Sequence, residues 1–181
     1  MKKNNFFLFF LFFSFDLLSQ DFTLDQIKSY PFPNELTGSS KSSKIAWAFD
    51  EQGKRNIYVA EGNDFIPRRL TSYMSDDGQE ISSLSVSSDG NWVVYVRGGD
   101  FGSNWDDELP VNPTFNPLPP KVQIWSFPFS GGNPILIDEG INPVISPNND
   151  KVAYIKNGQL WVSSINGDGE VGIGTTSNFD V

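Results

Sequence analysis

The sequence predicts an all-β fold in which one pattern of strands and turns occurs about three times. Two stretches share the pattern most clearly, ISSLSVSSDGNWVVYV at 81–96 and INPVISPNNDKVAYI at 141–155. In each, a strand ends in serine, a polar turn follows, and a second strand carries a tyrosine, Tyr95 or Tyr154. Alternating apolar and polar residues bounded by such turns are typical of short, half-buried strands.

The remaining strands complete each copy of the repeat. IAWAF at 45–49 matches the second strand, with Trp47 in the tyrosine position. A third strand with another aromatic residue follows in each copy, at 56–60 with Tyr58, 122–127 with Trp125 and 159–164 with Trp161. A fourth strand is expected twice, at 68–73 and 133–137. We expect the repeated aromatic side chains to pack between neighbouring copies.

The length of the repeat identifies the architecture. Ser87 and Ser146 are 59 residues apart, but the middle copy carries about 23 extra residues between Tyr95 and Trp125. Without them the step is about 36 residues, close to the roughly 40 of a four-stranded propeller blade. The sequence therefore predicts a partial β-propeller of about three four-stranded blades. We place the propeller at 44–168, with blades at about 44–73, 81–137 and 141–165.

Three blades cannot close a propeller ring, because a ring takes four to eight blades. Each open end would leave an apolar sheet face in water, so we expect self-association through the open blade faces. The final residues, 169–181, lack an apolar fourth strand for the third blade and are expected to form a divergent tail. The chain is thus expected to be the front part of a longer protein, or a truncated or frame-shifted reading of one.

The first residues predict export from the cell. Two lysines precede FFLFFLFFSF at 6–15, an apolar run too short for the roughly 20 residues that span a bilayer. We predict a signal peptide at 1–19, cleaved between Ser19 and Gln20, and a periplasmic or extracellular bacterial location. An uncleaved anchor is the alternative, whereas a lipid anchor is excluded because the chain has no cysteine.

Between the signal peptide and the propeller, residues 20–43 are expected to form a helical lead-in and a linker. Thr23 and Gln26 have the spacing of a capping box, which opens a short helix. Pro31 and Pro33 are expected to end it.

Composition excludes most chemistry for this chain. A net charge of −9 repels phosphate backbones, so no nucleic-acid partner is expected. The sequence has no histidine, no cysteine and no G-x-S-x-G, which excludes a Ser-His-Asp triad and thiolate catalysis. Acidic groups such as Asp76 with Asp77 are expected to be solvated turns, and no metal or cofactor site is predicted. We expect no catalytic residues in this chain.

The 23-residue insertion in the middle copy is the candidate functional segment. It runs from Arg97 to about Lys121, begins RGGDFGSNW and ends in a proline-rich arm. Long loops in compact folds are usually functional or disordered. We single out four residues as a surface toward substrate or another domain: Arg97, Asp100, Asn104 and Trp105. The alternative is a loop that only decorates the propeller.

Three stretches carry a resemblance to a known family. They are FTLDQIKSYPFPNELT, IAWAFDEQGKRNIYVAEGNDFIPRRLTSYMSDDGQEISSLSVSSDGNWVVYVRGGDFGSNW and KVQIWSFPFSGGNP. Together they resemble the amino-terminal propeller of bacterial exported peptidases of the prolyl oligopeptidase and dipeptidyl peptidase IV family, whose repeats are also similar to those of TolB. The resemblance covers about 21–168. It implies an α/β-hydrolase domain with a serine, aspartate and histidine triad after the propeller, and this sequence contains none of that domain.

Three hypotheses about function follow. The chain is the propeller portion of a secreted serine peptidase, with peptide substrate or the missing α/β-hydrolase domain as partner. Alternatively it is a periplasmic binding propeller of TolB type, or the remnant of a broken gene.

Overall fold

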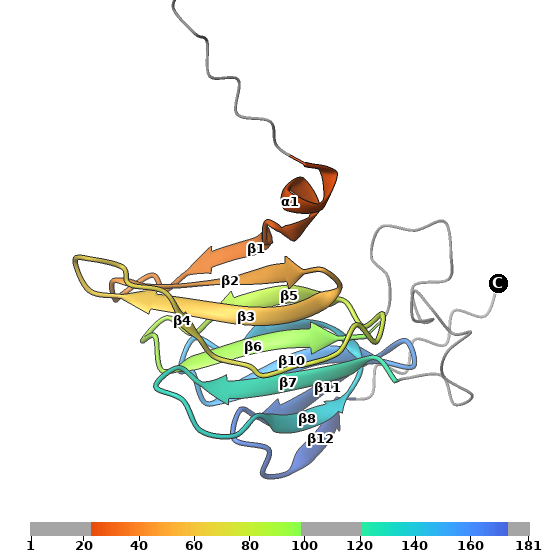
Figure 1. Ribbon diagram of the computed structural model, residues 1–181. Helices are drawn as coiled ribbons and strands as arrows, with labels where there is room; N and C mark the ends of the chain where they lie inside the picture. Colours follow the sequence, from red (N-terminus) through yellow and green to blue (C-terminus); the bar gives the residue numbers. More distant parts are fainter. Residues whose placement is uncertain (1–22, 99–120, 174–181) are drawn as a thin grey trace, which may run out of the picture.

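The computed structural model describes residues 23–98 and 121–173, which form three four-stranded antiparallel sheets and one short helix (Figure 1). The first sheet consists of β1 Phe32–Gly38, β2 Lys44–Glu51, β3 Lys54–Glu61 and β4 Arg68–Arg69. The second consists of β5 Ile81–Val86, β6 Trp92–Arg97, β7 Gln123–Pro128 and β8 Ile135–Glu139. The third consists of β9 Ile141–Ile145, β10 Lys151–Lys156, β11 Gln159–Ser164 and β12 Glu170–Ile173. In each sheet the strands lie in chain order, as in a propeller blade.

The three sheets are stacked face to face, as neighbouring blades are in a propeller (Figure 1). The first strands of the blades lie next to one another, since β1 contacts β5 and β5 contacts β9. Each of these inner strands has a residue with positive φ, namely Glu35 at 56°, Ser83 at 50° and Asn142 at 54°. Beside each of them the pairing with the second strand shifts its register, which is the signature of a β-bulge. The repeat in the sequence is therefore also a repeat of backbone geometry.

The repeated aromatic residues lie opposite one another within each blade. Trp47 pairs with Tyr58, Tyr95 with Trp125 and Tyr154 with Trp161. This common register confirms the expected equivalence of the second and third strands. Tyr95 and Tyr154 are almost fully buried between blades, whereas Trp47 lies on a side of the first blade that neither of the other two described blades covers.

Two apolar cores hold the blades together, and they define two sides for each blade. We call the side that faces the preceding blade the front face and the side that faces the next blade the back face. The first core joins blades one and two through Ala46, Ala48, Ile57, Val59, Leu70, Ile81, Leu84, Val93, Tyr95, Phe127 and Phe129. The second joins blades two and three through Val94, Val96, Ile124, Ile137, Val152, Tyr154 and Ile165. Burial of these side chains supplies the main driving force for stacking.

The helix α1, Leu24–Ser29, forms as expected from its capping box. The amide of Gln26 donates to Thr23 Oγ1 at 3.2 Å, and the amide of Thr23 donates to Gln26 Oε1 at 2.9 Å. Tyr30 caps the other end in an extended conformation. None of the residues of α1 is buried. No helix among the described residues is long and apolar enough to cross a membrane, and the predicted signal peptide with Ser19 and Gln20 lies outside them.

Two boundaries differ from those expected from the sequence. Residues 32–38, expected within the linker, form β1 and belong to the first blade, which therefore begins before residue 44. Pro33 and Glu35 are poor strand residues, but β1 pairs on one side only, where a missing amide donor is tolerated. Residues 170–173, expected in a divergent tail without a fourth strand, form β12 and pair with β11. Backbone pairing forms this strand although Gly172 interrupts the apolar pattern.

Candidate functional site

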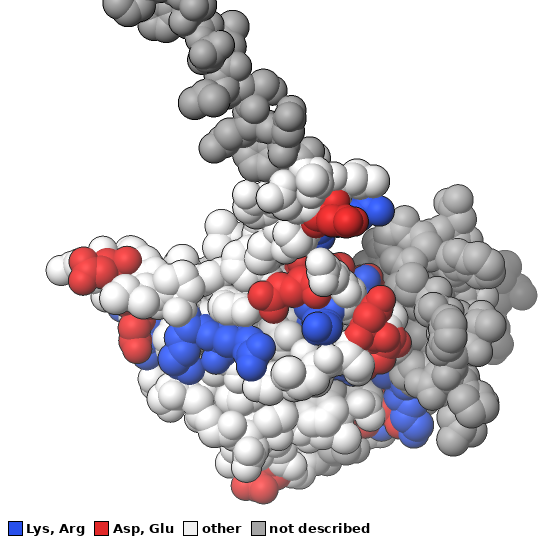
Figure 2. Space-filling view, in the orientation of Figure 1, with Lys and Arg blue, Asp and Glu red and all other residues white. Residues whose placement is uncertain are grey.

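Charged residues gather at one edge of the propeller, where the turns between the second and third strands lie. Figure 2 shows acidic and basic side chains mixed at this edge. Most of them form ion pairs with one another. We call this set the charged edge, and it consists of Asp50, Arg55, Asp76, Asp77, Glu80, Arg97, Lys121, Asp138, Glu139 and Lys156.

Arg97 ends β6 and bridges blades one and two. Its guanidinium lies 2.6 Å from Asp77 Oδ2 and 3.9 Å above the ring of Tyr73. An arginine stacked on an aromatic ring and paired with a carboxylate is held by both contacts at once. The side chain is only 18% exposed, so the blade boundary fixes its position.

Beneath Arg97, the hydroxyl groups of Tyr73 and Tyr95 form a hydrogen bond of 2.9 Å. Burial raises the pKa of Tyr95 well above its ordinary value, and the neighbouring Tyr73 raises this pKa further. Both phenols are thus neutral hydrogen-bonding groups in the folded chain. Their pair connects the end of the first blade to the second strand of the next.

A similar arrangement joins blades two and three. Asp138, at the end of β8, accepts from the Tyr154 hydroxyl at 2.7 Å and from Lys156 Nζ at 2.6 and 2.7 Å. The Lys156 ammonium also lies 5.3 Å from the centre of the Trp161 ring. Burial alone would raise the pKa of Asp138, but the hydrogen bonds from Lys156, Tyr154 and the Glu139 amide outweigh it and lower the pKa below its ordinary value.

The two arrangements occupy equivalent positions of the repeat. Arg97 and Lys156 each come two residues after the repeated tyrosine and each end the second strand of a blade. Their carboxylate partners, Asp77 and Asp138, each lie just ahead of the next inner strand. We call each arrangement an inter-blade clasp. In the first blade the same position holds Phe49, which cannot form a clasp.

A second arginine, Arg55, organises the outer part of the charged edge. Arg55 lies 3.4 Å from Asp50, 3.7 Å from Asp76 and 2.9 Å from Glu80. Asp50 also accepts from the amide of Gly53 at 2.6 Å, which closes the turn between β2 and β3. Asp76 is therefore a member of an ion-pair network and not a solvated turn residue alone.

The structure describes one of the four candidate site residues that the sequence predicted. Arg97 lies on the charged edge, while Asp100, Asn104 and Trp105 lie outside the described residues. Within residues 23–98 and 121–173, no group of three carboxylate, histidine or cysteine side chains is placed to hold a metal ion. Sequence reasoning missed Asp138, although an acid directly after the apolar run ILI in a repeat with Lys156 was a usable signal.

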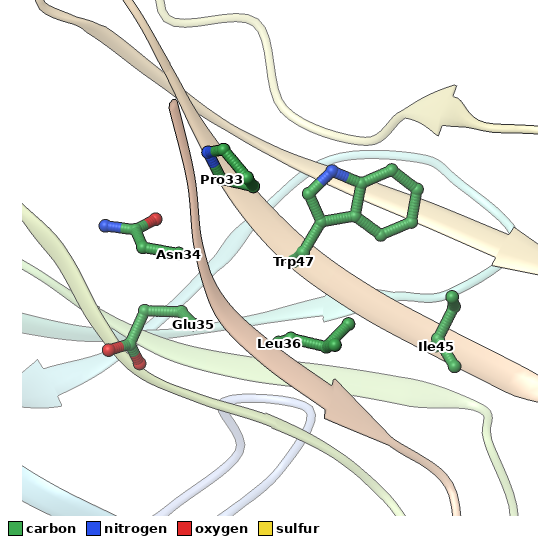
Figure 3. Close-up of a pocket in the computed structure, with 6 residues that line it drawn as sticks. All are labelled: Pro33, Asn34, Glu35, Leu36, Ile45 and Trp47. Carbon is green, nitrogen blue, oxygen red and sulfur yellow. The ribbon is translucent and has the colours of Figure 1, made fainter. Parts of the chain in front are cut away.

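The front face of the first blade contains a hollow of about 560 Å³ lined mostly by apolar groups (Figure 3). Its lining residues are Pro33, Asn34, Glu35, Leu36, Ile45 and Trp47. Next to it, the rings of Trp47, Phe49 and Tyr58 lie with centres 5.0 to 6.0 Å apart. Such spacing is typical of packed aromatic clusters.

No family model and no curated protein matches this chain. Among solved structures, a putative TolB from Agrobacterium tumefaciens is 14% identical with a TM-score of 0.51, over 79% of this chain and 48% of that chain. The β-propeller domain of the Trilobed protease from Pyrococcus furiosus is 11% identical with a TM-score of 0.51, over 79% of this chain and 43% of that chain. The tricorn protease is 12% identical with a TM-score of 0.55, over 79% of this chain and 13% of that chain.

At these identities the likeness concerns the fold alone. This chain spans less than half the length of each of these structures. The neighbours include TolB propellers and propeller domains of proteases, and the three described sheets stack in the same way. The chain is a partial β-propeller.

Proposed function

We propose that this chain is the non-catalytic propeller portion of an exported serine peptidase, in which a separate α/β-hydrolase domain hydrolyses peptides. The chain has no histidine, cysteine or nucleophile elbow, so it supplies contacts and not chemistry. The propeller would bind peptide or restrict its access to the hydrolase. The sequence resemblance to such peptidases and the fold shared with protease propeller domains support the proposal.

The observation that carries the proposal is where the insertion after β6 leaves the propeller. Its two ends are fixed at the charged edge, because Arg97 pairs with Asp77 and Lys121 pairs with Glu139. The amide of Gly98 donates to Glu80 O at 3.0 Å, and a Cβ on Gly98 would lie 2.7 Å from Lys121 O. The ends of the insertion are therefore side by side. A loop presented by a rigid scaffold is a common way to build a binding surface.

The same surface fits a second function, a periplasmic binding propeller of TolB type without enzymatic activity. The fold shared with a putative TolB favours it, and such a propeller would use the same edge for protein contacts. Both functions require export, for which the predicted cleavage between Ser19 and Gln20 is the proposed route.

A deletion tests the role of the insertion in the intact parent protein. Removing 99–119, which keeps Gly98 and its hydrogen bond to Glu80, should weaken peptide binding or the association of the two domains, while the propeller keeps its thermal transition. Exchange of the exposed Met74 for Ser, in the connection between β4 and β5 and outside the insertion, is the matched control and should leave binding unchanged. Unaltered peptide kinetics and domain association after the deletion would contradict a functional insertion.

Two measurements separate the candidate functions. The coding sequence beyond Val181 should continue in frame to a G-x-S-x-G motif and later aspartate and histidine codons if the parent is a peptidase. A stop after further blades would favour the TolB-type function instead. The purified 20–181 chain should hydrolyse neither p-nitrophenyl acetate nor fluorogenic peptides, and turnover that an organophosphate abolishes would refute its non-catalytic role.

A further inference from the structure

The front face of the first blade has the residues of a blade–blade contact, but none of the described blades lies against it. Glu35 and Ser83 mark the same bulge, so Pro33, Leu36, Ile45 and Trp47 are the equivalents of Ile81, Leu84, Val93 and Tyr95. All four equivalents in the second blade are buried in the core that joins it to the first blade. Leu36 is 75% exposed, whereas Leu84 is 8% exposed.

The third blade confirms that this is the docking side of every blade. Pro143 is the equivalent of Leu36, since Asn142 carries the positive φ of this bulge, and Pro143 is buried. Val152 and Tyr154, at the positions of Ile45 and Trp47, are buried against the second blade. The hollow in Figure 3 is thus the empty half of a contact that is filled twice elsewhere in the chain.

The complementary half lies on the back face of the third blade. On the first blade the back face is formed by Ala46, Ala48, Ile57 and Val59, and these pack against blade two. The equivalents on the second blade are Val94, Val96, Ile124 and Ser126. The equivalents on the third blade are Ala153, Ile155, Leu160 and Val162, which pair in the same register. No described blade covers them, and the adjacent Val144 is 65% exposed.

The unfilled contact does not depend on a charged partner. Arg97 and Lys156 need a carboxylate on the preceding blade, but Phe49 replaces them on the first blade. The front face there presents the aromatic cluster of Trp47, Phe49 and Tyr58. An aliphatic back face, such as that of the third blade, is a chemically suitable surface for it.

We propose that two copies of this chain associate head to tail, each placing the front face of its first blade on the back face of the third blade of the other. Both contacts then form at once and close a ring of six blades. Repeated head-to-tail contacts close into a ring only if the rotation from one copy to the next permits it. Propeller rings close with about four to eight blades. Two copies satisfy this range, while a third copy would give nine blades. The contact follows from blade packing and does not depend on the proposed peptidase role.

The test measures the mass of the 20–181 chain by size-exclusion chromatography with light scattering, over a range of concentrations. We expect a dimer. Leu36→Glu on the front face and Val144→Glu on the back face should each weaken the dimer by at least about 100-fold in Kd. Both copies carry the substitution, so either variant places a buried carboxylate in both contacts of the ring. Both side chains are exposed in the single chain, so both variants should keep its fold. Met74→Glu, an exposed position in the connection between β4 and β5 and in no strand of either face, is the matched control and should remain dimeric.

Mixing the two variants tests the direction of the contact. A Leu36→Glu chain keeps its back face and a Val144→Glu chain keeps its front face, so a mixture should form a heterodimer with one intact contact. Neither variant should associate by itself. A dimer that Val144→Glu leaves unchanged would indicate a front-to-front contact and overturn the proposal. A wild-type chain that stays monomeric at all concentrations would overturn it as well, and would favour a further blade of a longer chain as the occupant.

Discussion

Replacement of Asp138 by asparagine should destabilise the fold by about 2 kcal/mol at neutral pH. The side chain is 8% exposed and accepts from the Tyr154 hydroxyl, from Lys156 Nζ and from the Glu139 amide, all within 2.7 Å. An asparagine keeps one carbonyl acceptor and removes the charge. A lost hydrogen bond to a charged group costs about 1.5–3 kcal/mol, and the partial exposure of Lys156 keeps the loss below the 3–5 kcal/mol of a fully buried pair.

The effect of this substitution should depend on pH. The folded-state pKa of Asp138 lies below its ordinary value of 3.8, so the charged carboxylate stabilises the folded chain. That contribution is fully present above the unfolded-state pKa and is lost as the pH falls through the folded-state pKa. The difference between wild type and Asp138→Asn should therefore be largest near pH 7 and shrink below about pH 4.

Urea unfolding at a fixed protein concentration, followed by tryptophan fluorescence, measures both effects. The control is Glu139→Gln, which breaks the exposed pair with Lys121 and should cost at most about 0.5 kcal/mol. A loss for Asp138→Asn no greater than for this control would refute the clasp as a source of stability. So would a loss that is the same at pH 7 and pH 3.

Three further substitutions test the other blade boundary. Tyr95→Phe should cost about 1–2 kcal/mol in urea unfolding, because it leaves the partly buried Tyr73 hydroxyl without its partner; no change would mean that water replaces this bond. Arg97→Met should cost about 1 kcal/mol and make stability less sensitive to salt, since the pair with the Asp77 carboxylate is lost; an unchanged salt dependence would contradict this. Gly98→Ala should lower the thermal midpoint more than Gly62→Ala, because both have positive φ but only Gly98 places the new Cβ 2.7 Å from a backbone oxygen; equal shifts would show that the chain relaxes there.

The sequence repeat made the three blades predictable. The two strands that lack a clear repeat signal, β1 and β12, were not predicted. Paired aromatics such as Tyr95 and Trp125 fixed the second and third strands of each blade, and the structure places them in the expected register. The sequence did not predict β1, because Pro33, Asn34 and Glu35 are residue types depleted in strands and made the segment look like part of the linker. The sequence did not predict β12, because Gly172 interrupts the apolar pattern of this short strand and glycine is depleted in strands.

The candidate site was predictable only in part for a different reason. Arg97 was singled out from its place before the insertion, but its partners Tyr73 and Asp77 come from the connection between blades. Such contacts depend on how two sheets stack, and the local sequence pattern of one strand holds no information about that stacking. Once Arg97 and Lys156 are aligned through the repeated tyrosines, the second clasp could have been inferred from the first.

Each blade is built from one uninterrupted stretch of chain, and this has a consequence for folding. Strand pairings within a blade join segments that are near in sequence, which keeps the contact order of each sheet low and favours fast formation. During synthesis the first blade can pair its strands before the second has left the ribosome, and each finished blade then offers its back face as a template for the next. Because no sheet takes a strand from a distant part of the described chain, blades can be gained or lost at either end without breaking a hydrogen-bonded sheet.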